Sequence, residues 1–300
     1  MTKNISNSPW GINSDANYFA WREKKLAQAR ELQSAKMVEI ADLAKPSQQE
    51  KAELLRRVEH TNIAFYQTNA STDSDTVRLE LRGFADSLGL RIAEKHRSAG
   101  KNGIVAITPS KAKGQVGYIP YSKKPLNWHT DGYYNAPDEQ IHSMVLHCFS
   151  PASSGGQSQI IDNEIAYIRL RDENPAYIEA LMHEEAMSIP QNIDESGNIR
   201  PISIGPVFSI DANNNSLIMR YTARTRSIEW RKDKTTQEAV EFLQNLLENG
   251  DEFIQTTTLK AGQGILCNNS LHNRKSFDSE VNKQRLLFRV RFFNRIKESK

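Results

Sequence analysis

A histidine and an aspartate two residues apart are the side chains in this sequence best placed to bind a metal ion. They are His129 and Asp131, in the stretch Asn-Trp-His-Thr-Asp-Gly-Tyr-Tyr-Asn of residues 127–135. On an extended strand, residues i and i+2 point to the same side, so the imidazole and the carboxylate can reach one ion. Two imidazoles and one carboxylate, with coordination positions left open, form the ligand set of non-heme Fe(II) sites. A second histidine must therefore come from elsewhere in the chain.

The histidine that best fits this role is His272. It follows a turn and a strand expected at residues 261–271, and Asn273 and Arg274 come directly after it. A lone histidine is more often structural than a ligand, but here a His-x-Asp stretch and a downstream strand of arginines accompany it. The sequence therefore predicts a catalytic metal site of His129, Asp131 and His272.

The arginine strand covers residues 285–293 and alternates in character. Leu286, Phe288, Val290 and Phe292 share one face, and Arg285, Leu287, Arg289 and Arg291 share the other. Arginines are costly to bury without anionic partners. Two interpretations follow: a solvated edge strand whose basic side chains oppose aggregation, or an inner wall whose guanidinium groups bind carboxylates.

Four motifs in a fixed order resemble a known family. They are His129-Thr-Asp131, Gly155-Gly-Gln-Ser158, Asn269-Ser-Leu-His272-Asn-Arg274 and the strand from Arg285 to Arg289. Together they resemble the Fe(II)/2-oxoglutarate-dependent dioxygenases of the TauD/TfdA, clavaminate-synthase-like superfamily. The resemblance covers roughly residues 105–295.

The resemblance implies a role for each matching residue. His129, Asp131 and His272 would bind Fe(II), and Arg285 would pair with the distal carboxylate of 2-oxoglutarate. Ser158 stands where the family usually has threonine, and either hydroxyl can donate a hydrogen bond to the co-substrate. Arg289 would help to bind the co-substrate or would hold an acidic group of the substrate.

The resemblance also implies the reaction. With Fe(II), O₂ and 2-oxoglutarate, the enzyme would hydroxylate or otherwise oxidise an unactivated C–H bond of a small, anionic or amino-acid-like substrate, releasing succinate and CO₂. Asn127, Tyr133 and Tyr134 flank the ligand pair, either as substrate contacts or as core packing. Two alternatives stay open: a jelly-roll metal enzyme that does not use 2-oxoglutarate, and a degenerate jelly roll that only binds a ligand.

The order of expected elements indicates the fold class. Helical patterns cover about residues 17–36, 47–59 and 75–88, and short strands prevail after residue 100, with helices at 172–187 and 235–248. We expect a mainly β fold with α decorations (α+β): a double-stranded β-helix, or jelly roll, over residues 101–300, with residues 1–100 as a helical segment packed on it as part of one compact domain.

Composition narrows the class of protein. The 39 basic and 36 acidic residues among 300 are too evenly balanced to indicate a nucleic-acid surface. We expect no secretory signal in the polar first residues and no membrane span, since no apolar run approaches about 20 residues. Cys148 and Cys267 are expected to be buried thiols in a reducing compartment. A cytoplasmic enzyme with a small-molecule substrate is predicted, and homo-oligomerisation is left open.

Overall fold

The computed structural model describes residues 8–12, 15–91, 103–112, 115, 118–193, 197, 199–280 and 284–297. The chain divides into two compact units, each made of three segments. The first unit comprises Met1–Ser34, Trp128–Gln140 and Ile161–Gln255, and the second comprises Ala35–Asn127, Ile141–Ile160 and Thr256–Lys300. The boundary expected near residue 100 lies outside the described residues.

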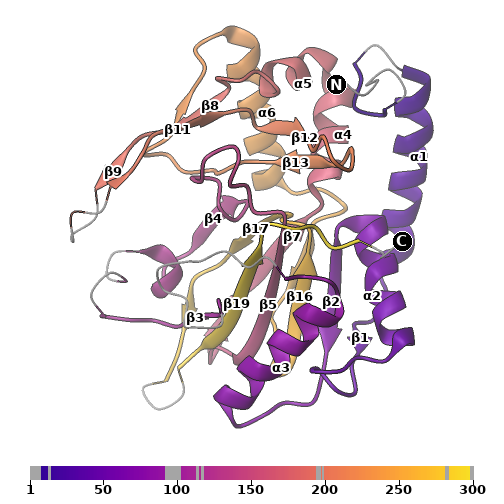
Figure 1. Ribbon diagram of the computed structural model, residues 1–300. Helices are drawn as coiled ribbons and strands as arrows, with labels where there is room; N and C mark the ends of the chain where they lie inside the picture. Colours follow the sequence, from indigo (N-terminus) through magenta and orange to yellow (C-terminus); the bar gives the residue numbers. More distant parts are fainter. Residues whose placement is uncertain are drawn as a thin grey trace. The chain divides into compact units, whose positions relative to one another are not determined.

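A six-stranded sheet lies in the second unit, in the order β1-β2-β16-β5-β19-β3 (Figure 1). Its strands are β1 (Val38–Glu39), β2 (Ile63–Gln67), β16 (Gln263–Cys267), β5 (Ser143–Ser150), β19 (Leu286–Phe292) and β3 (Val105–Ile107). The arginine strand β19 is antiparallel to both β5 and β3, so it has a neighbour on each side. The interpretation of this strand as a solvated edge is therefore wrong.

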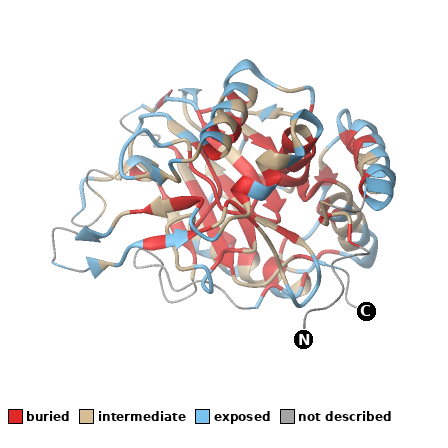
Figure 2. Ribbon diagram, turned by 90° about the horizontal axis from the view of Figure 1, so that it is seen from above, coloured by how far each residue is buried: buried red, intermediate tan, exposed pale blue. Residues whose placement is uncertain are grey.

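The two faces of this sheet bury different partners. Phe288 and Val290 of β19 pack with residues of α2 (Gln48–Thr61) and α3 (Ser74–Ser87). Leu287 points to the opposite face, where it packs in a second hydrophobic cluster with Ile160. The alternation predicted for the strand is confirmed, and its arginines are buried rather than solvated. Figure 2 shows the sheet strands as largely buried and the outer helix faces as exposed.

A four-stranded sheet supplies the other side of that second cluster. Its order is β15 (Gln255–Thr257), β7 (Ser158–Ile161), β17 (Leu271–Arg274) and β4 (Leu126–His129). A short ribbon of β6 (Ser154–Gly155) and β18 (Phe277–Asp278) leads into β7. The chain thus combines helices with many strands, as expected for its class.

The first unit holds the remaining helices of the described chain. They are α1 (Asp15–Leu32), α4 (Asn163–Glu173), α5 (Pro175–Leu181) and α6 (Lys234–Asn249). Its three-stranded sheet consists of β11 (Ser203–Gly205), β8 (Met187–Ile189) and β14 (Glu229–Trp230). A hairpin consists of β12 (Phe208–Ile210) and β13 (Leu217–Met219). A two-stranded ribbon consists of β9 (Asn192–Ile193) and β10 (Ile199–Arg200).

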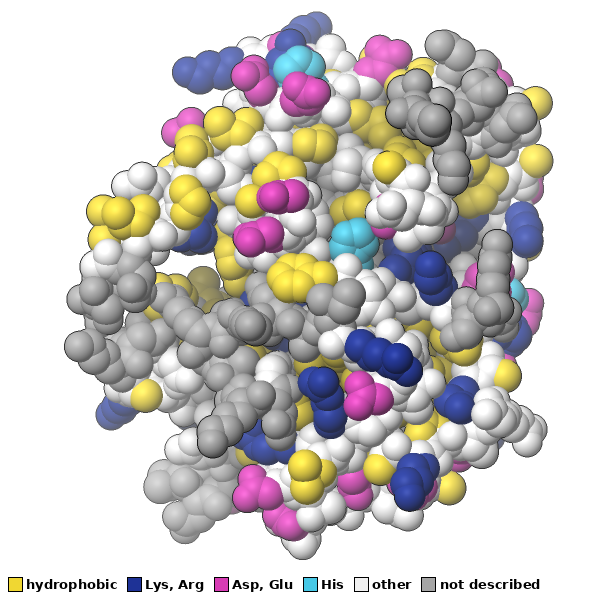
Figure 3. All heavy atoms as spheres, in the orientation of Figure 1, with side chains coloured by type: hydrophobic (Ala, Val, Ile, Leu, Met, Phe, Trp, Pro, Cys, Tyr) yellow, Lys and Arg dark blue, Asp and Glu magenta, His cyan; other side chains and the backbone are white. Residues whose placement is uncertain are grey.

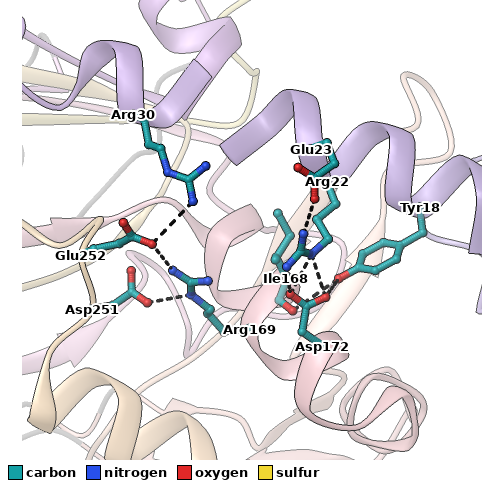
Figure 4. A network of polar contacts seen from close by, with 9 residues as sticks. All are labelled: Tyr18, Arg22, Glu23, Arg30, Ile168, Arg169, Asp172, Asp251 and Glu252. Atoms are coloured by element: carbon teal, nitrogen blue, oxygen red, sulfur yellow. Dashed lines mark hydrogen bonds and ion pairs between the residues drawn. The ribbon is translucent and has the colours of Figure 1, made fainter. Parts of the chain in front are cut away.

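Polar contacts hold α1 against α4 (Figure 4). The Tyr18 hydroxyl donates to Asp172 over 2.6 Å, and Arg22 forms an ion pair with the same carboxylate at 2.7 Å. Arg169, one turn earlier on α4, pairs with Asp251 at 2.7 Å. Because Asp172 accepts from two α1 side chains, it fixes the register between the two helices.

Local expectations are mostly confirmed, with one correction. Ser47 and Glu50 form the predicted capping box at the start of α2, and both cysteines are free and buried. The single helix expected at 172–187 is wrong. Asn174 ends α4 and caps α5 through its side chain, and the chain is extended again from Met187. The residue before Pro175 is extended, so α5 begins only at Pro175, and the backbone is extended again at Met187. The helix expected over 172–187 is therefore shortened at both ends.

The surface gives two further observations. No helix in the described part of the chain is long and apolar enough to cross a membrane. On the face seen in Figure 3, basic and acidic side chains are interspersed and hydrophobic ones are scattered. That face has no extended area of a single charge sign.

Candidate metal centre and anion pocket

The His-x-Asp stretch is fixed by backbone pairing. His129, the last residue of β4, bridges to Thr222. The Thr130 amide donates to the Tyr221 carbonyl at 3.0 Å, and the Thr130 hydroxyl accepts from the Tyr221 amide at 3.0 Å. Because the Thr130 side chain is committed to that partner, those of His129 and Asp131 leave the chain on the other side. Both are buried, which protects a bound ion from bulk water.

His272 lies on β17 and is oriented by its own backbone. Its Nδ1 lies 2.9 Å from the Ser270 carbonyl oxygen. A carbonyl oxygen can only accept, so Nδ1 carries the proton and Nε2 keeps a lone pair for a metal. The turn before His272 is held in place. Asn269 has a left-handed φ of 50°, and its side-chain amide donates to the Ile141 carbonyl at 2.7 Å. This asparagine is the first residue of the motif that the sequence analysis identified around His272.

The strands that carry these ligands are neighbours in the four-stranded sheet, since β17 lies next to β4. One ligand atom from each of His129, Asp131 and His272 lies within 4.8 Å of the other two. Two imidazole nitrogens and one carboxylate oxygen are the donor set that suits Fe(II) with open coordination positions. The chemistry of these residues therefore fits the metal that the sequence implies.

Two of the residues expected to bind 2-oxoglutarate line one pocket of the second unit. The lining comprises Ala152, Gly155, Gly156, Ser158, Thr258, Leu259, Arg285 and Leu287. Arg285 is 5% exposed, and burial lowers the pKa of its guanidinium to about 10. It forms no ion pair with a carboxylate in the part of the chain that the structure describes. A buried cation beside a hydroxyl is the chemistry that binds a carboxylate.

Arg289 lies farther along the inner face of β19. It pairs with Leu146 of β5 and Val105 of β3, and it is buried. Leu287 and Arg291 lie on the same face of the strand as Arg289. The guanidinium groups of Arg289 and Arg291 therefore lie side by side on one face of β19.

The residues around the ligand loop differ in whether they pack in the core or lie beside the metal ligands. Trp128 is buried, and its indole donates to the Leu247 carbonyl at 3.2 Å, so it is a packing residue. The Tyr133 ring lies edge-on to His129 with centroids 6.2 Å apart, and its hydroxyl accepts from Arg224 at 3.1 Å. Tyr134 lies against the Tyr133 ring. Asn127 is exposed on β4.

Arg224, which donates to the Tyr133 hydroxyl, was not singled out by the sequence analysis. A signal was present, because residues 220–232 contain five basic side chains and one acidic one. That run could not be assigned to the site from sequence, since nothing local indicates that it pairs with the His-x-Asp stretch.

Comparison with known proteins gives a consistent result. The family described as "Taurine catabolism dioxygenase TauD, TfdA family" matches residues 24–291. A uridine-5'-phosphate dioxygenase of Amycolatopsis sp is 26% identical over 169 residues, which are 54% of this chain and 59% of that protein. The chain thus matches less than two thirds of the length of this curated relative.

Solved structures share the fold at low sequence identity. The non-heme iron oxygenase OrfP, in complex with Fe, succinate and (3S)-hydroxy-L-Arg, has a TM-score of 0.64 and 14% identity, covering 91% of this chain and 92% of its own. A putative alpha-ketoglutarate-dependent taurine dioxygenase from Burkholderia xenovorans has a TM-score of 0.56 and 14% identity, with 86% of each chain covered.

Proposed function

The chain belongs to the TauD/TfdA family of Fe(II)- and 2-oxoglutarate-dependent dioxygenases, and on this premise we propose that it oxidises a C–H bond of a small anionic molecule, with release of succinate and CO₂. The observation that carries the proposal is the pair of sites: a His/Asp/His donor set and a buried arginine in a pocket that forms no ion pair with the carboxylates of the described residues. The two sheets around the inner hydrophobic cluster support a double-stranded β-helix, with the early helices α2 and α3 covering its outer face.

His129, Asp131 and His272 would hold the iron. When bound, Fe(II) supplies the activation of O₂ and the oxidation chemistry. The protein's part is to present the ligands. The Ser270 carbonyl keeps the His272 Nε2 unprotonated, and the Thr130–Tyr221 pairing keeps the other two ligands on one side of the chain. Their burial excludes water from the reacting groups.

Arg285 and Ser158 would bind the distal carboxylate of 2-oxoglutarate. The guanidinium offers two parallel N–H donors, and the serine hydroxyl offers a third. In a buried pocket such charge-assisted hydrogen bonds are strong because little water competes for them. Arg289, on the same inner face, would supply a further cation for an acidic group of the co-substrate or the substrate.

The ligand loop supports an anionic substrate with a planar group. Tyr133 presents its ring next to His129, and Arg224 places a guanidinium at the far end of that ring. Tyr134 and Asn127 would extend the same wall. The curated relatives are named for uridine 5'-phosphate, which joins a planar base to a phosphate, so it is the first substrate to test. An amino acid is the second candidate, since OrfP was solved with (3S)-hydroxy-L-Arg.

Anaerobic titration with Fe(II) and 2-oxoglutarate tests the enzyme class. The parent protein should develop the weak visible charge-transfer absorption of an iron-bound 2-oxo acid, and His272→Ala should not. Iron binding without this absorption would favour a metal enzyme that does not use 2-oxoglutarate. No metal binding at all would favour a ligand-binding protein. Succinate formation with each candidate substrate, compared between Arg224→Ala and Arg226→Ala, then tests the substrate wall.

A further inference from the structure

The Phe277 ring lies close to two buried guanidinium groups. The Cζ atom of Arg274 is 4.8 Å from the centre of its ring, and that of Arg285 is also 4.8 Å away. Both distances are within the range of a cation–π contact. The ring is 5% exposed, so water screens neither contact effectively.

The two arginines differ in what else holds them. Arg274 donates to the backbone carbonyls of Ser122 at 2.9 Å, Pro120 at 3.4 Å and Lys124. These carbonyls fix its guanidinium. The Arg285 guanidinium forms no hydrogen bond within the described residues and has the Phe277 ring as its one aromatic contact there. The ring is therefore the main element that sets the direction of Arg285.

The fold holds Phe277 beside the pocket residues. It lies on β18, which pairs with β6, and a Cβ on Gly156 would come within 3.2 Å of the Phe277 Cβ and 3.7 Å of the Arg285 Nε. Gly156 lines the pocket that contains Arg285, and Phe277 itself lines an outer groove. Phe277 thus packs against the pocket wall from the outside.

We propose that Phe277 is a positioning residue that holds Arg285 toward the pocket. This inference rests on the proposed use of 2-oxoglutarate. Arg274, which is anchored to carbonyls, contacts the same ring and helps to fix its position.

The test compares Phe277→Leu with Phe253→Leu. Phe253 is a matched control in the first unit: it is also 5% exposed and also lies under two guanidinium groups, those of Arg30 at 5.8 Å and Arg169 at 5.4 Å. Binding of 2-oxoglutarate to the Fe(II)-loaded proteins is measured by anaerobic calorimetry, together with iron affinity. Phe277→Tyr keeps the ring and serves as the conservative variant.

We expect Phe277→Leu to bind 2-oxoglutarate about tenfold more weakly, the size of one desolvated cation–π contact. Its iron affinity should be unchanged. Phe253→Leu and Phe277→Tyr should bind like the parent. Parent-like binding by Phe277→Leu, or equal losses in Phe277→Tyr and Phe277→Leu, would overturn the inference. A parent protein that binds iron but no 2-oxoglutarate would instead overturn the proposed function on which it rests.

Discussion

Replacing Arg285 by methionine should stabilise the free protein and abolish co-substrate binding. Burial lowers the pKa of this guanidinium from its ordinary value to about 10, a shift that corresponds to about 3 kcal/mol disfavouring the charged form in the fold. At neutral pH the group is charged in both the folded and the unfolded chain, so the whole cost acts against folding. Methionine is flexible and apolar, and it can fill the same space against Phe277.

The expected magnitudes follow from what the substitution removes. The gain of about 3 kcal/mol is offset by about 1 kcal/mol for the lost cation–π contact with Phe277, so Arg285→Met should be roughly 2 kcal/mol more stable than the parent without ligand. With 2-oxoglutarate, the loss of a buried charge partner should weaken binding by about 2–5 kcal/mol, or roughly 30-fold to several thousand-fold.

Urea unfolding with and without Fe(II) and 2-oxoglutarate measures both effects. The parent should gain about 2.7 kcal/mol at a ligand concentration one hundred times its dissociation constant, and Arg285→Met should gain almost nothing at that concentration. Arg274→Met is the matched control. It removes a buried arginine that donates to four backbone carbonyls, so it should destabilise the protein, because the carbonyls lose their donors. If Arg285→Met proves less stable than the parent without ligand, the reasoning about an uncompensated buried charge is refuted.

Three further outcomes are expected. His272→Ala should lower iron affinity at least tenfold, measured by metal content after dialysis, whereas His183→Ala should not; equal losses in both would contradict the ligand assignment. Ser158→Ala should weaken 2-oxoglutarate binding roughly tenfold or more and Ser158→Thr should preserve it, as calorimetry would show. His147 is buried on β5, and its Nδ1 lies 3.2 Å from the hydroxyl oxygen of buried Tyr66. Burial lowers the pKa of His147 from 6.5 to about 4, so the folded chain binds fewer protons than the unfolded one between these pH values, and about 3 kcal/mol of stability should be lost as pH falls from 6.5 to 4. A pH series of urea midpoints should lose this slope in the double variant His147→Phe, Tyr66→Phe, which removes the imidazole and its hydroxyl partner together.

Elements whose signals are local could be predicted from the sequence. The capping box of Ser47 and Glu50 is complete within four residues, so it marked the start of α2. Alternation over β19 separated its apolar face from its arginine face, and the core follows that separation. What alternation could not decide was whether the arginine face met solvent or the interior. That depended on β5 and β3 lying on both sides of β19, a long-range fact.

Features that depend on distant segments were not predictable. Arg224 reaches Tyr133 across 91 positions of sequence, and the pairing of Thr130 with Tyr221 that makes this contact has no local mark. The contacts of Arg274 and Arg285 with the Phe277 ring are a similar case. The three residues are close in sequence, but the positions of β17 and β18 had to be known before their side chains could be assigned to one cluster.

The end of β19 shows how one strand can serve both the core and the site. Pairing with β5 is regular from Leu287 to Phe292 and shifts register between Leu286 and Leu287. Such an irregularity ends the regular ladder and re-aims the side chains before it. Arg285 comes before the shift and Leu287 directly after it, and both line the anion pocket. The Arg285 Cζ lies 4.8 Å from the centre of the Phe277 ring, whereas Leu287 also packs in the second hydrophobic cluster, so this end of the strand serves both the pocket and the core.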